Sequence, residues 1–154
     1  MTSFTLEGYE KLKMPFLKKF EYISKWGHKL EKDYFETMNI DKKEYGYSDF
    51  AANNVKYLDR IPSKILYTRG MHLTFLRGGF KGIFYRPIDE RSRNIMSSMG
   101  GKKVAEIKIE DDSEGNPING EVLELSYMSR EDFIKATAHL DLGVKQKIQP
   151  YAKL

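Results

Sequence analysis

The chain lacks cysteine altogether, has only three histidines among its 154 residues, and contains no long apolar run. Without cysteine it cannot form a disulfide, a thiolate nucleophile or a cysteine-based zinc site. The histidines are far apart, so we expect no metal site and no bound cofactor. A membrane-spanning helix needs about 20 apolar residues, and the charged start MTSFTLEGYEKLK does not resemble a secretory signal. These absences predict a cytoplasmic protein that does not enter membranes.

Arginine is concentrated in one stretch, whereas lysine is spread through the sequence. Residues 60–93 hold six of the seven arginines and two lysines against two carboxylates, which gives the stretch a net charge of +6. The whole chain carries +4, so the remainder is weakly acidic. A guanidinium binds phosphate or carboxylate through two parallel hydrogen bonds. The stretch therefore predicts an anion-binding surface.

Apolar spacing divides the chain into a helical first part and a strand-rich second part. Apolar residues recur every three or four positions over 16–38, which predicts a helix with a bend at Gly27. Ser48 is placed to cap a second helix that runs through Leu58. Beyond it we expect three short strands, a helix, a hairpin around an acidic loop, and a last helix capped by Ser129. Their ranges are 64–68, 71–76, 82–86, 88–99, 104–110, 121–128 and 129–139.

This order of elements is typical of the α+β class. We expect N-terminal helices packed on a mixed or antiparallel sheet, with a C-terminal helix, in a single domain over residues 1–154. Glycines at 70, 78, 79 and 82 are expected to form the turns between the three short strands.

Aromatic residues alternate with the cations of the arginine-rich stretch. Cations that follow a phosphate backbone beside aromatic faces that stack on bases are typical of single-stranded nucleic-acid binding. The predicted phosphate-binding residues are Arg69, Arg77, Lys81, Arg86, Arg91 and Arg93, and the predicted stacking residues are Tyr67, Phe75 and Tyr85. The same pattern also fits a half-exposed sheet, or a surface for an acidic protein.

A histidine and a threonine two residues apart suggest a catalytic alternative. His72 and Thr74 would share one face of a strand, and His139 with Asp141 forms a second such pair. The first pair resembles the motif of the 2H phosphoesterases. That resemblance implies acid–base catalysis by two imidazoles on a phosphodiester, with hydroxyls that bind the phosphate.

An acid-x-lysine pair gives a second catalytic alternative. Glu106 and Lys108 would lie on one face of a strand, with Asp89 upstream. This arrangement resembles the PD-(D/E)xK nuclease core. The resemblance implies that Asp89 and Glu106 hold Mg²⁺ while Lys108 stabilises the attacking water; only this alternative implies a metal.

The leading hypothesis from the sequence is a small intracellular protein that binds rather than catalyses. Its expected partner is nucleic acid or another phosphate-bearing ligand, with an acidic protein surface as an alternative. The nuclease and phosphoesterase interpretations stay open. A structural, assembly or inhibitor protein, including a small viral component, also stays open, and the chain is compatible with a homo-oligomer.

Overall fold

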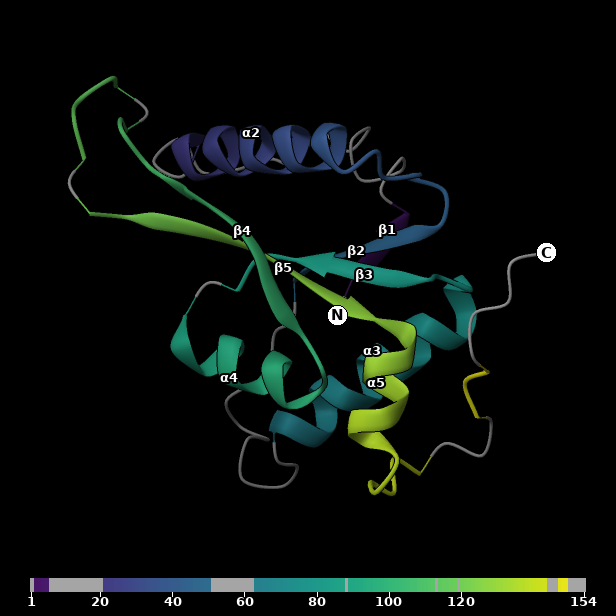
Figure 1. Ribbon diagram of the computed structural model, residues 1–154. Coiled ribbons are helices and arrows are strands. Elements are labelled where there is room, and N and C mark those ends of the chain that lie inside the picture. The colour runs from purple at the N-terminus through teal and green to yellow at the C-terminus, as the bar shows by residue number, and fades with distance from the viewer. Residues whose placement is uncertain are drawn as a thin grey trace.

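The computed structural model describes seven ranges of the chain and the elements they form (Figure 1). The described ranges are 2–5, 21–50, 63–87, 89–112, 114–118, 120–143 and 147–149. The strands are β1 (Thr2–Thr5), β2 (Tyr45–Phe50), β3 (Gly82–Tyr85), β4 (Lys102–Lys108) and β5 (Val122–Ser129). The helices are α2 (Glu21–Thr37), α3 (Ser63–Gly78), α4 (Glu90–Ser98) and α5 (Arg130–Thr137).

The five strands form one mixed sheet in the order β1-β2-β3-β5-β4. β2 and β3 are parallel, because α3 connects them, and the other neighbours are antiparallel. Helix α2 lies across one face of the sheet, and α3, α4 and α5 cover the opposite face (Figure 1). The predicted α+β class, with helices on a mixed sheet and a helix near the C-terminal end, is confirmed.

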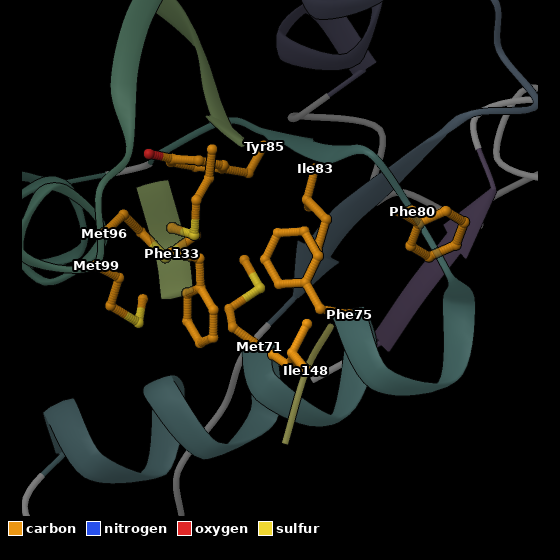
Figure 2. Close-up of a cluster of buried hydrophobic side chains, with 10 residues drawn as sticks. Met71, Phe75, Phe80, Ile83, Tyr85, Met96, Met99, Phe133 and Ile148 are labelled. Carbon is orange, nitrogen blue, oxygen red and sulfur yellow. The ribbon is translucent and has the colours of Figure 1, made fainter. Parts of the chain in front are cut away.

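The core under α3, α4 and α5 is built mainly from methionine and phenylalanine (Figure 2). Met71 and Phe75 come from α3, Met96 from α4 and Phe133 from α5, and all four are buried. The rings of Phe75 and Phe133 lie with their centroids 5.1 Å apart. These contacts fix the inner side of α3, so its opposite side faces outward.

A second core, with a buried ion pair beside it, joins α2 to the other face of the sheet. Leu30 and Phe35 of α2 pack on Phe84 of β3, whose ring centroid lies 4.9 Å from that of Phe35. Arg86 Nε lies 3.1 Å from Glu31 Oε1, with side chains only 13 % and 6 % exposed. The Tyr47 hydroxyl also donates to this carboxylate.

The helix expected over 16–38 is confirmed from residue 21 to residue 37; residues 16–20 lie outside the described ranges. Gly27 does not interrupt it. A β-carbon at Gly27 would lie 1.4 Å from Arg86 Nη1, so this glycine allows the buried arginine to approach α2.

Two predictions around α3 are wrong. The strands expected over 64–68 and 71–76 are one helix, in which Gly70 is an interior residue rather than a turn. The Thr68 and Thr74 hydroxyls donate to the carbonyls four residues before them, as threonine does within helices. The helix expected to begin at Ser48 is also wrong, because Ser48 lies in β2; residues 51–62 are outside the described ranges.

The remaining expected elements are confirmed with small shifts of their ends. β3, α4, β4, β5 and α5 form where the sequence places them, and β4 and β5 pair as a hairpin. The hairpin reaches toward the N-terminal end of α2 (Figure 1), where Trp26 Nε1 donates to Asp111 Oδ1 at 2.9 Å. The Ser129 side chain accepts from Asp132 N–H at 2.9 Å and caps α5, which ends at Thr137 rather than at 139.

Candidate functional site

The outer side of α3 carries exposed cations. Arg69 and Arg77 are exposed there, whereas Thr68, Met71 and Phe75 on the other side are buried. Lys64 shares the side of Thr68 and Met71 but is exposed, because it lies in the first turn of the helix. The helix contains no aspartate or glutamate. Within the described ranges, neither Arg69 nor Arg77 takes part in an ion pair. Among the described residues, no carboxylate neutralises either guanidinium group.

A shallow hollow of about 460 Å³ lies where the first turns of α3 and α4 meet. It is lined by Lys64, Glu90, Arg91, Asn94 and Ile95. Two cations and one amide face one carboxylate there beside an isoleucine, so the hollow is weakly positive and partly apolar. It brings Arg91 of α4 beside Lys64 at the start of α3. We call Lys64, Arg69, Arg77 and Arg91 the α3–α4 surface.

The other predicted phosphate-binding residues contact carboxylates. Arg93 Nε lies 3.0 Å from Glu124 Oε2 on β5. Arg86 pairs with Glu31 on the α2 side of the sheet. Lys81 Nζ lies 3.9 Å from Glu44 Oε2. The structure thus does not bring the six predicted cations together on one surface; Arg69, Arg77 and Arg91 stay on the α3–α4 side.

The predicted stacking residues belong to the core. Phe75 has 0 % and Tyr85 4 % of its surface exposed, so neither ring offers a face to a base, and that prediction is wrong for both. Tyr67 is half-buried and packs against the same cluster. Burial raises the pKa of the Tyr85 hydroxyl, while a hydrogen bond with Ser126 opposes the shift.

The phosphoesterase interpretation required His72 and Thr74 on one face of a strand. On the helix α3 they are about 200° apart around the axis, so they point to different sides. The Thr74 hydroxyl donates to the Gly70 carbonyl at 3.0 Å, and the His72 ring lies 6.4 Å from that of Phe133. His139 and Asp141 lie beyond the end of α5, and the Asp141 carboxylate accepts from Gly143 N–H. The expected pairing of imidazole and hydroxyl on one face is therefore wrong.

The nuclease interpretation placed Glu106 and Lys108 on a strand, and β4 contains both. Asp89, however, is the N-cap of α4, where its carboxylate accepts from Ser92 N–H at 2.6 Å. These contacts with Ser92 lower the pKa of Asp89. Glu106 accepts from Lys103 Nζ at 2.9 Å. In the described part of the chain, no group of three histidine, aspartate or glutamate side chains is placed to hold a metal ion.

Sequence reasoning missed the carboxylates that pair with the arginines. Glu124 lies directly opposite Glu106 in the hairpin register, and like charges at such positions repel unless each has a cation. Glu31 lies between Gly27 and Phe35 on the apolar side of the 16–38 helix. A carboxylate at an apolar position of a helix is a signal for a buried cation, because charges are rarely buried unpaired.

Comparison with protein-family models, with curated proteins and with solved structures gives no match for this chain. Among the described residues, none of the helices has the length and apolar character needed to cross a membrane.

Proposed function

We propose that the protein binds a phosphate-rich partner, nucleic acid, through the α3–α4 surface. One observation carries the proposal: α3 exposes Arg69 and Arg77, has no carboxylate of its own, and pairs neither arginine within the described ranges. Lys64 and Arg91 extend the positive charge to the hollow at the start of α3 and α4.

The spacing of the two arginines suits a repeating anion. Eight residues along a helix correspond to about 12 Å, so Arg69 and Arg77 can contact two separate phosphates of one backbone. Each contact releases condensed counterions, which makes the affinity fall as salt rises. An isolated carboxylate ligand would occupy only one of the two positions.

The test is the salt dependence of binding to a short labelled oligonucleotide, measured by fluorescence anisotropy. The double variant Arg69→Ala/Arg77→Ala should weaken binding and reduce the slope of log K against log salt by about 1.4–1.8, at roughly 0.7–0.9 per phosphate contact. The matched control is Lys32→Ala/Lys108→Ala, which removes two exposed cations from α2 and β4. It should change the slope far less.

Two results would contradict the proposal. One is an affinity that stays constant between about 50 and 200 mM salt, because phosphate contacts would then be absent. The other is an equal loss of affinity in the control variant, which would show that only net charge matters.

A further inference from the structure

The outer side of α3 alternates leucine with arginine. Leu66, Arg69, Leu73 and Arg77 follow one another at spacings of three, four and four residues, which places them along one side of the helix. Leu66 is 41 % exposed, and its neighbour Ile65 is 39 % exposed. Leu73 is half-buried and belongs to neither core cluster. Leu66 is therefore presented to solvent beside Arg69, and the half-buried Leu73 lies between Arg69 and Arg77.

A ligand for this side must satisfy both kinds of side chain. Phosphates satisfy the arginines, but a leucine gains only from a surface that is itself apolar. In a duplex the flat faces of the bases are stacked inside, and the grooves present mainly polar edges, with the thymine methyl group as the small apolar exception. In a single strand the base faces are accessible beside the phosphates.

We infer that the α3–α4 surface selects single-stranded nucleic acid. Arg69 and Arg77 contact phosphates, and Leu66 and Leu73 pack against the faces of unstacked bases. This inference rests on the proposed function and adds the form of nucleic acid that is bound. The charge of the surface argues for this occupant, because α3 carries cations and no carboxylate.

The test separates the apolar contribution from the charge. The variant Leu66→Gln/Leu73→Gln keeps the charge and the helix propensity of α3 while it removes the apolar contacts. It should weaken binding of a single strand about tenfold, and change binding of the duplex of the same sequence by less than about twofold. The slope of log K against log salt should stay unchanged, since no phosphate contact is lost.

A matched control removes exposed apolar surface elsewhere. Met38 and Val122 are 53 % and 54 % exposed, so Met38→Gln/Val122→Thr removes comparable surface away from α3. It should leave the affinity for both forms unchanged. Circular dichroism and thermal unfolding confirm that each variant is folded before binding is compared.

The possible outcomes distinguish failure of single-strand selection from failure of the proposed function on which it rests. Equal loss on single strand and duplex, or no loss on either, overturns single-strand selection and leaves the proposed function in place. If neither form binds, the proposed function fails as well. If poly-glutamate, which has charge but no phosphate or base, competes as strongly as a single strand, the surface is one for an acidic protein and both proposals fail.

Discussion

Replacement of Gly27 by alanine should favour the helix α2 locally but disturb a tertiary contact, and the two effects change the free energy of unfolding in opposite directions. In an unobstructed helix interior the change stabilises by about 1 kcal/mol. Gly27, however, is buried, and the new methyl group would lie 1.4 Å from Arg86 Nη1. The guanidinium must move for the methyl group to fit.

The ion pair opposes that movement. Arg86 and Glu31 have side chains 13 % and 6 % exposed and lie 3.1 Å apart, and the Tyr47 hydroxyl also donates to Glu31. Separation of a buried pair costs about 3–5 kcal/mol. The loss exceeds the gain, so Gly27→Ala should destabilise by about 2–4 kcal/mol. At about 2–4 °C per kcal/mol for a chain of this size, the unfolding midpoint should fall by roughly 4–16 °C.

Urea unfolding followed by fluorescence of Trp26, the single tryptophan, measures the effect. Lys32→Ala, an exposed change on the same helix, should alter the free energy of unfolding by less than about 0.5 kcal/mol. In an Arg86→Ala background, Gly27→Ala should instead stabilise, because the obstructing side chain is gone. A gain in stability from Gly27→Ala in the unmodified chain would refute this account of how α2 is held.

Two further substitutions test contacts that position α3 and α4. Arg130 donates to the Phe75 and Phe80 carbonyls at 2.6 and 2.7 Å. Arg130→Met should therefore lower the free energy of unfolding, measured in urea, by about 3–5 kcal/mol. A loss below about 1 kcal/mol would contradict this role. Asp89→Ala should lower the free energy of unfolding by about 1 kcal/mol at neutral pH through loss of the cap. Asp89→Ser should keep most of the stabilisation that the cap gives. Because its hydrogen bonds with Ser92 lower the pKa of Asp89 in the folded chain, its contribution is present above its ordinary value of 3.8 and is lost as pH falls through the lower folded value. The Asp89→Ala effect should therefore shrink as the pH falls below 3.8 and disappear once Asp89 is protonated in the folded chain. An effect of constant size down to the acid limit of folding would count against the cap.

Elements with strong local signals were predicted from the sequence. The 3.6-residue period identifies α2, the Ser129 cap identifies α5, and alternation around an acidic loop identifies the β4–β5 hairpin. Helix α3 was not predicted, because apolar residues occupy all of its sides. Short stretches of its sequence therefore have the apolar pattern of strands. Its exposed leucines are the reason that the helical period is hidden. The feature that misled the sequence prediction is thus the one that supports single-strand binding.

The candidate site was predicted in part, because a cluster of arginines in sequence does not fix which side of a sheet each one reaches. Arg86 follows β3, at the boundary between the two layers, and turns to the α2 side. Arg69 and Arg77 are carried on a helix that covers the opposite face. A count of charges along the sequence cannot separate Arg86 from Arg69 and Arg77, because the carboxylate that pairs with Arg86 lies in α2, more than fifty residues earlier.

The number of phosphate contacts decides between the surface seen in the structure and the one expected from the sequence. Four contacts on a single strand, from the α3–α4 surface, give a slope of log K against log salt near −2.8, at about 0.7 per contact. The six contacts expected from the sequence would give about −4.2. Lys81, Arg86 and Arg93 would then have to leave Glu44, Glu31 and Glu124. Separation of the buried Arg86 pair alone costs about 3–5 kcal/mol, which is more than one phosphate contact contributes. We therefore expect the smaller slope. A slope near −4.2 in the unmodified chain, reduced by Arg86→Ala, would show that the buried pair opens on binding and that the surface is larger than the α3–α4 residues.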